Sequence, residues 1–214
     1  MIRRLGLAFL KGLSLTSSFR REGDPNPPVL FLLGTVTPAW VKRVIWNFKY
    51  HKVSPYGSSP ASFVMYIATH CDSSTRLLDV GCGSGTFLRE LRAAGWTGQY
   101  TGLDISPRAI QDAKRLCGEN AEWIAGDVET FRTDGQWDVI CFIESVYYVP
   151  VGNLLTVLRR LATYLGEDGY IIMRVWNWAK HSDHIRELSQ HCPGFEAERG
   201  SDSIVRITKS QLLC

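Results

Sequence analysis

The chain has 214 residues, of which 45% are hydrophobic and 21% are charged, and its formal net charge is +3. This length suits one well-buried domain and is short for two. So small a net charge gives no global basic field, and we expect no nucleic-acid partner. No apolar run reaches the roughly 20 residues of a transmembrane helix. The six cysteines form no C-x-x-C pair, which favours small buried thiols in a reducing compartment over a disulfide framework or a zinc site.

Basic residues are concentrated at the start of the chain. Residues 1–21 hold five of them and no acid, so 19 basic and 21 acidic residues remain in the rest of the chain. Such a segment suits a helix on a membrane surface, an organelle-targeting peptide or a solvated arm, and all three stay open. We expect residues 1–29 to be a basic arm and proline-rich linker. The expected location is cytoplasmic, with peripheral membrane contact through residues 1–21, and organelle targeting is the alternative.

Residues 30–70 are predicted to form a helical cap region ahead of the core. Apolar residues between positions 40 and 52 recur at helical spacing and are accompanied by lysine and arginine. This pattern predicts a short basic amphipathic helix that packs on the core or caps the site. Ser59 and Pro60 predict the N-cap and first residue of a second helix, which runs to about His70.

Strands and helices alternate through residues 71–214, which are predicted to form the core. Alternation of this kind indicates a parallel sheet with helices on both faces. Two final short strands around Gly200 predict an antiparallel hairpin. The predicted fold is therefore α/β and doubly wound, with a mostly parallel seven-stranded sheet. The strands are expected at residues 76–80, 100–104, 121–125, 137–143, 170–175, 194–199 and 203–209, and the helices at 87–94, 107–117, 153–165 and 182–191.

A glycine-rich turn follows the first of these strands. Three glycines stand at alternate positions 81, 83 and 85, directly after a strand that ends near Asp79. Glycine tolerates positive φ and lets a ligand approach the backbone closely. A dinucleotide turn has the spacing G-x-G-x-x-G and places a pyrophosphate at the helix N-terminus. Here the third glycine comes one position early, and the carboxylate of Asp79 disfavours a pyrophosphate and favours a cationic ligand, so a nicotinamide oxidoreductase is disfavoured.

Acidic residues stand at or just after the ends of four successive predicted strands. In an open parallel sheet, ligands bind at the carboxyl ends of the strands, near the switch in strand order. Asp104 lies 25 residues after Asp79, and an acid at the end of the second strand can accept both hydroxyls of a ribose. The four acids in chain order are Asp79, Asp104, Asp127 and Glu144.

The turn and this ordered set of acids resemble the class I (Rossmann-like) S-adenosylmethionine-dependent methyltransferase family over residues 76–209. The resemblance implies S-adenosylmethionine as the cofactor. It also implies that Asp127 binds the adenine amino group, with the backbone N–H of Val128 and an apolar contact from Ile105 against the ring. Cys82 then serves as a small residue inside the turn. The implied cofactor-binding residues are Asp79, Gly81, Cys82, Gly83, Gly85, Asp104, Ile105, Asp127, Val128 and Glu144.

The same resemblance implies that the loop after the fourth strand borders both the methionine part of the cofactor and the acceptor. The candidate catalytic residues are Glu144, Tyr147 and His181. Glu144 would orient the acceptor or take a proton, and Tyr147 would flank the sulfonium or hydrogen-bond the acceptor. His181 would be a base for an O-methyl acceptor. The alternatives are a surface or cofactor-facing acid without chemistry for Glu144, plain packing for Tyr147 and a polar helix residue for His181. The five histidines show no metal-binding spacing, so we expect no metal.

Further aromatic and histidine residues are expected to line the acceptor pocket. The loop at 144–148 is expected to face residues 176–184 across the sulfonium. The additional lining candidates are Tyr148, Trp176, Trp178 and His184, with Tyr50 or Tyr56 closing over them.

The loop lacks the Asn-Pro-Pro-Tyr or Asp-Pro-Pro-Tyr motif, which counts against methylation of nucleobases. Its residues 144–148, Glu-Ser-Val-Tyr-Tyr, resemble those of nodulation N-methyltransferases that act on amino sugars. The predicted function is S-adenosylmethionine-dependent N- or O-methylation of a small-molecule, sugar or lipid-linked acceptor. The alternatives are a catalytically silent cofactor-binding partner protein and another transferase on the same fold, such as an aminopropyltransferase. The sequence leaves the oligomeric state open.

Overall fold

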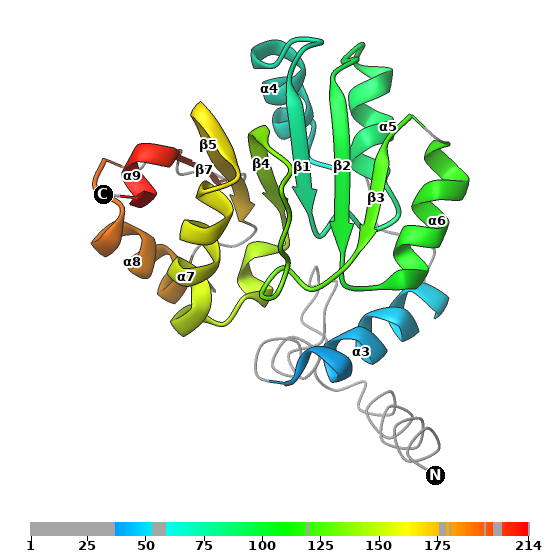
Figure 1. The fold of residues 1–214 in the computed structure, drawn as a ribbon, viewed down its shortest axis with the longest axis horizontal. Helices are drawn as coiled ribbons and strands as arrows, with labels where there is room; N and C mark the ends of the chain where they lie inside the picture. The colour runs from blue at the N-terminus through cyan, green and yellow to red at the C-terminus, as the bar shows by residue number, and fades with distance from the viewer. Residues whose placement is uncertain are drawn as a thin grey trace.

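The computed structural model describes residues 37–52, 59–118, 120–175, 179, 181–194, 196–198 and 203–213. Within these ranges a seven-stranded sheet has the order β3-β2-β1-β4-β5-β7-β6 (Figure 1). The first five strands in the chain are parallel, and β7 is antiparallel to both β5 and β6. Their bounds are β1 (Arg76–Val80), β2 (Gln99–Asp104), β3 (Glu122–Ala125), β4 (Trp137–Ile143), β5 (Leu165–Val175), β6 (Glu196–Glu198) and β7 (Ser203–Thr208).

The strand order reverses at β1, which lies between β2 and β4. In open α/β sheets, ligands bind at such a switch in strand order, outside the carboxyl ends of the strands. The predicted doubly wound sheet with an antiparallel hairpin at one edge is confirmed. The turn of the predicted hairpin lies outside the described residues.

Each face of the sheet has its own hydrophobic core, because successive residues of a strand point to opposite faces. Leu77 contributes to the core under α4, α5 and α6, and Leu78 to the core under α7, α8 and α9. Both leucines are fully buried, which stabilises the fold by roughly 1.5–3 kcal/mol for each side chain. The helices are α4 (Ala61–His70), α5 (Thr86–Ala93), α6 (Pro107–Cys117), α7 (Val151–Ala162), α8 (Ser182–His191) and α9 (Lys209–Leu213).

The predicted basic helix is present as α3 (Ala39–Lys52). Figure 1 shows α3 lying across the end of the sheet to which the arrowheads of β1, β2 and β3 point. The helix contacts α6, and its Trp46 ring meets the Tyr148 ring edge-on, with centroids 4.7 Å apart. The basic arm at residues 1–29 lies outside the described residues, so its division from the rest of the chain stays a prediction.

Three details of the predicted elements are wrong. Pro60, not Ser59, is the N-cap residue of α4, which starts at Ala61 and has no side-chain hydrogen bond at its cap. Leu165 does not belong to α7, which ends at Ala162; it opens β5 and pairs with Trp137. The last predicted strand ends at Thr208, and the chain continues as the short helix α9.

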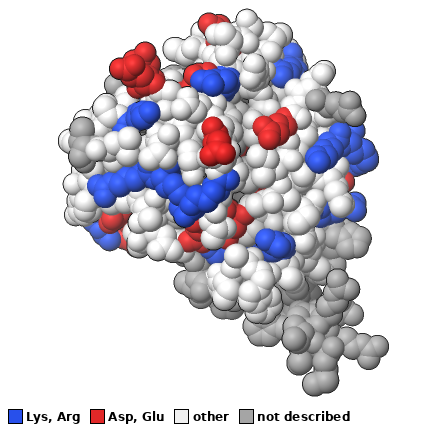
Figure 2. Space-filling view, viewed as in Figure 1, with Lys and Arg blue, Asp and Glu red and all other residues white. Residues whose placement is uncertain are grey.

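Basic and acidic side chains are interspersed over the face of the molecule seen in Figure 2, in keeping with the nearly balanced composition. No helix among the described residues has both the length and the apolar character needed to cross a bilayer.

Candidate functional site

The glycine turn after β1 adopts the conformation that its sequence predicts. Gly81, Gly83 and Gly85 have φ angles of 83°, 57° and 79°, a region that side chains with a Cβ rarely occupy. The backbone N–H of Gly81 donates to the Leu103 carbonyl at 2.7 Å. A Cβ on Gly81 would lie 2.5 Å from the Cβ of Ser145. The turn is therefore wedged between β2 and the loop after β4, and glycine is needed there on both conformational and steric grounds.

Asp104, at the end of β2, lies directly against this turn. Its carboxylate accepts hydrogen bonds from the backbone N–H of Gly83 at 3.0 Å and of Ser106 at 2.8 Å. The side chain is 7% exposed, and burial raises its pKa to about 6, against the lowering effect of these two bonds. Strands β1 and β2 thus bring the predicted ribose-binding acid to the glycine turn. This geometry fits a diol, whose two O–H groups donate to a carboxylate.

Asp79 lies deeper, below the turn. Its carboxylate accepts a hydrogen bond from the Tyr100 hydroxyl at 2.5 Å and a weaker one from the Cys141 thiol at 3.6 Å. The residue is 1% exposed, and burial raises its pKa to about 7. These two hydrogen bonds join Asp79 to the neighbouring strands β2 and β4. Binding of the cofactor by Asp79 itself stays a prediction.

Asp127 lies two residues after β3 and is also buried. Its carboxylate accepts a hydrogen bond from the backbone N–H of Glu129 at 2.9 Å, which stabilises the loop after the strand. Ile105 and Val128 are partly buried beside these acids in sequence. The Val128 carbonyl accepts a hydrogen bond from the guanidinium of Arg160. Cys82 is 7% exposed, as expected of a small residue inside the turn.

The fourth acid, Glu144, is held by side chains from two directions. One carboxylate oxygen is ion-paired with the Arg174 guanidinium of β5, and the other accepts a hydrogen bond from the Tyr147 hydroxyl at 2.8 Å. Glu144 has a φ of 57°, which is unusual for a residue with a side chain and often marks a functional loop. Both of its oxygens are engaged, so the carboxylate is positioned as an orienting group.

The three predicted catalytic residues come together beside this loop, to which His181 is brought from the N-cap of α8. The Tyr147 and His181 rings are stacked, with centroids 4.1 Å apart and planes inclined by 6°. Both side chains are buried. Burial raises the pKa of Tyr147 well above its usual value, so its phenol keeps its proton near neutral pH and remains a donor.

His184 is held by the backbone of the loop after β4, and its predicted place in the acceptor pocket stays a prediction. Its Nε2–H donates to the Val149 carbonyl at 2.9 Å, and burial lowers its pKa, so the ring is neutral. Trp176, Trp178 and Tyr56 lie outside the described residues, as does the side chain of Tyr50. The predicted pocket wall that they would form stays a prediction.

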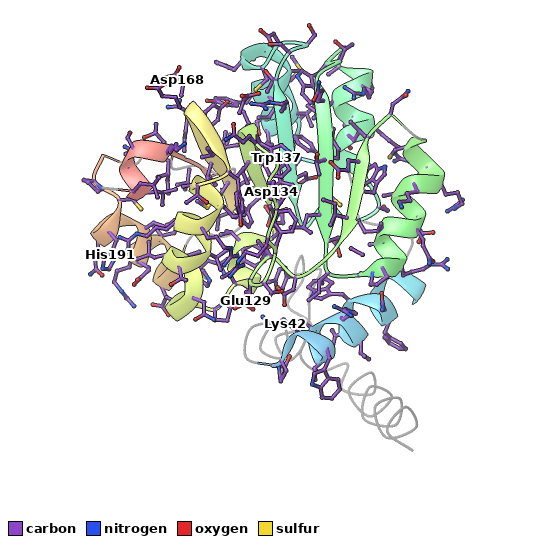
Figure 3. The ribbon with its side chains drawn as sticks, in the orientation of Figure 1. Lys42, Glu129, Asp134, Trp137, Asp168 and His191 are labelled. Atoms are coloured by element: carbon purple, nitrogen blue, oxygen red, sulfur yellow. The ribbon has the colours of Figure 1, made fainter. Side chains whose placement is uncertain are left out.

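Four residues that the sequence analysis did not single out complete the arrangement. Arg174 pairs with Glu144, and an arginine inside an apolar strand was a usable signal for it. Asn47 accepts a hydrogen bond from the Ser106 hydroxyl at 2.6 Å. Lys42 of α3 is 5% exposed and forms an ion pair with Glu129 at 2.6 Å, and Figure 3 shows the two side chains side by side below the sheet.

A doubly wound sheet with a hairpin at one edge, a glycine turn at the switch point and acids at or just after the ends of four strands defines the Rossmann-like methyltransferase class. Comparison with known proteins agrees with this class. A family model described as a methyltransferase domain matches residues 53–202. The chain belongs to this methyltransferase-domain family.

The sequence identity to individual curated proteins is low, and the matches cover only part of each protein. The chain is 32% identical to nodulation protein S of Sinorhizobium fredii (strain NBRC 101917 / NGR234) over 101 residues, which cover 46% of each protein. It is 26% identical to the dTDP-3-amino-3,6-dideoxy-alpha-D-glucopyranose N,N-dimethyltransferase of Streptomyces fradiae over 165 residues, which cover 74% of this chain and 60% of that protein. The chain thus spans about half the length of the curated relatives that it matches.

Among solved structures, the magnesium protoporphyrin IX methyltransferase of Synechocystis PCC 6803 with bound S-adenosylmethionine superposes with a TM-score of 0.60. The match covers 81% of this chain and 98% of that one, at 16% identity. At this identity the likeness supports the fold alone.

Proposed function

We propose that this chain is an S-adenosylmethionine-dependent methyltransferase. The observation that carries the proposal is the contact of buried Asp104 with the backbone of Gly83, which joins a hydroxyl-binding acid to a turn open to close approach. Asp104 would hold the ribose hydroxyls and the turn would lie against the rest of the cofactor. Asp127, Val128 and Ile105 would surround the adenine. When bound, the cofactor supplies an already activated methyl group.

The chain's own residues then have to align an acceptor and exclude water, since alignment provides a large share of the acceleration in such a displacement. The Tyr147 hydroxyl donates its hydrogen to Glu144, so its oxygen is left to accept a hydrogen bond from an N–H or O–H group of the acceptor. The position of this oxygen is set by Glu144 and by the stack of the Tyr147 ring on His181. Glu144 is itself fixed by Arg174. We assign Glu144 and Tyr147 to orienting the acceptor and His181 to accepting a proton from a hydroxyl acceptor.

The proposed acceptor is a small molecule that carries an amine on a sugar ring. Two observations support this class. One relative is named as an N,N-dimethyltransferase of a nucleotide-linked amino sugar. The loop 144–148 also lacks the motif used for planar amines of nucleobases. Hydroxyl groups of sugars or of lipid-linked molecules are the second choice.

We also propose a cytoplasmic protein that touches an anionic membrane surface at its N-terminal side. On α3, Trp40 is 61% exposed and Val44, one turn later, is 46% exposed, with exposed Arg43 between them. Residues 1–21 add five basic residues without an acid. Each basic residue near an anionic surface contributes about 1 kcal/mol, and the attraction fades with salt. Co-sedimentation with anionic but not neutral vesicles, weakened by deletion of residues 1–21 and by Trp40→Ser, is the expected result.

Two measurements test the enzymatic proposal. Calorimetry with S-adenosylhomocysteine should show one site per chain, whereas NAD should give no heat. Folded protein that gives no heat with S-adenosylhomocysteine at about 100 μM, well above the usual micromolar range, contradicts the cofactor assignment. A screen of amino sugars, sugars, amines and lipids should then release S-adenosylhomocysteine from S-adenosylmethionine. Binding without release in any pool favours a silent binding protein.

A further inference from the structure

We infer that α3 is a clasp that fastens the cofactor-binding loops, with Lys42 and Asn47 as positioning residues for the acids after β3 and β2. The inference rests on the proposed function only in that it takes the cofactor to lie at these acids. Through these loops, α3 influences the affinity for the cofactor without contacting it.

The first set of contacts links Lys42 to Asp127 through Glu129. The Lys42 ammonium pairs with the Glu129 carboxylate at 2.6 Å, and their side chains are only 7% and 20% exposed (Figure 3). The backbone N–H of Glu129 donates to the carboxylate of Asp127 at 2.9 Å. Asn153 of α7 donates to the other Glu129 oxygen at 2.8 Å. A partly buried carboxylate held from two sides fixes the loop, and removing its cation leaves an uncompensated charge.

The second set of contacts links Asn47 to Asp104 through Ser106. The side-chain oxygen of Asn47 accepts a hydrogen bond from the Ser106 hydroxyl at 2.6 Å. The backbone N–H of Ser106 donates to the carboxylate of Asp104 at 2.8 Å. The Ser106 oxygen also accepts a hydrogen bond from the backbone N–H of Ala109 and thereby caps α6. Asn47 thus binds the residue that orients the predicted ribose-binding acid.

The two sets of contacts, from Lys42 to Asp127 and from Asn47 to Asp104, have the same arrangement. In each, the acid accepts a hydrogen bond from the backbone N–H two residues later, and a side chain of α3 holds that later residue. Lys42 and Asn47 lie five positions apart on one helix and reach loops after different strands. A third contact, the Trp46 ring against the Tyr148 ring, extends the same helix to the loop after β4.

The consequence is a thermodynamic link between the position of α3 and the binding of the cofactor. If the ligand binds the acids only when their loops are held, it binds the clasped state more tightly, and by reciprocity it stabilises the clasp. Weakening the clasp therefore lowers affinity for the cofactor without removing any group that touches it.

The test uses the full-length protein and S-adenosylhomocysteine as the probe. We expect Lys42→Met and Asn47→Ala each to weaken its binding about 5-fold or more in calorimetry, the lower end of usual coupling between sites. Lys42→Arg, which keeps the charge, should recover most of the affinity. Glu129→Gln should weaken the binding of S-adenosylhomocysteine as much as Lys42→Met does. The double variant Lys42→Met/Glu129→Gln should bind only slightly more weakly than either single variant. Arg43→Met is the matched control, because it removes an exposed charge from the same helix, and its affinity should equal that of the wild type.

A second readout does not depend on the variants. Backbone amide hydrogen exchange across residues 39–52 of the wild type should slow when S-adenosylhomocysteine binds. A wild type that does not bind the probe contradicts the proposed function. A wild type that binds it, with unchanged exchange in α3 or with affinities within twofold in Lys42→Met and Asn47→Ala, overturns the clasp alone.

Discussion

At the carboxyl ends of the parallel strands, the acids that follow β2 and β3 are held differently from the acid that follows β4. After β2 and β3, Asp104 and Asp127 accept hydrogen bonds from backbone N–H groups close by in the loops and the glycine turn. After β4, Glu144 is instead held by the side chains of Arg174 and Tyr147. The first arrangement depends on backbone conformation, and the second depends on which side chains meet.

This difference suits the two ligands that we propose. A cofactor common to a whole family is served by acids that the backbone itself positions. An acceptor that differs between relatives is served by a side-chain cluster, which single substitutions can reshape without altering the fold. Substitutions in the two regions should therefore have different effects: those in the backbone-held region should affect stability or cofactor affinity, and those in the side-chain cluster should affect turnover.

The largest effect is expected in the glycine turn, where the backbone conformation is decisive. Gly81→Ala should lower the free energy of unfolding by about 2–5 kcal/mol, because a left-handed residue acquires a Cβ and that Cβ clashes with Ser145. The matched control is Gly95→Ala, which has the same sign of φ and nothing within 4 Å of the added carbon. Its cost should be only about 1–2 kcal/mol. Equal losses in urea denaturation would show that the clash plays no part.

The buried acid beneath the turn provides the next test. Burial raises the pKa of Asp79 to about 7 from 3.8, so the folded state binds more protons than the unfolded state between these values. The contribution of Asp79 to stability is therefore greatest at low pH and declines as the pH rises through this window. Asp79→Asn cannot ionise, and relative to wild type it should gain about 2 kcal/mol or more between pH 4.5 and 8. A stability difference that is constant with pH contradicts this account.

Substitutions in the side-chain cluster should lower turnover and leave the affinity for the cofactor unchanged. Tyr147→Phe removes the hydroxyl that donates to Glu144 and should lower kcat about 10- to 100-fold on the acceptor found by the screen, since alignment acts in the transition state. Calorimetry with S-adenosylhomocysteine should agree with wild type within about twofold. If Glu144→Gln, Tyr147→Phe and His181→Ala all keep full turnover, the assignment of the side-chain cluster to the acceptor is wrong.

The same division separates what the sequence predicts from what it does not. The bounds of β1, β4 and α6 follow from local pattern, and the structure confirms them. The contact of Asp104 with the glycine turn follows from parallel strands ending at one edge. The pairing of Lys42 with Glu129 joins residues 87 positions apart, and no local pattern specifies which acid a lysine reaches. The pairing of Arg174 with Glu144 likewise depends on tertiary structure, because it requires β4 and β5 to be neighbours in the sheet.

The most direct test of the central claim is the affinity for S-adenosylhomocysteine of wild type, Asp104→Asn and Asp168→Asn between pH 5 and 8. Asp168 is exposed at the opposite end of β5 and serves as the control (Figure 3). Burial raises the pKa of Asp104 to about 6, and only the ionised carboxylate accepts hydrogen bonds from both ribose hydroxyls. Wild-type affinity should therefore fall about tenfold per pH unit below pH 6 and be level above pH 7. Asp168→Asn should follow wild type, and Asp104→Asn should bind more weakly with no such pH dependence. Wild-type affinity and pH dependence in Asp104→Asn would place the cofactor elsewhere.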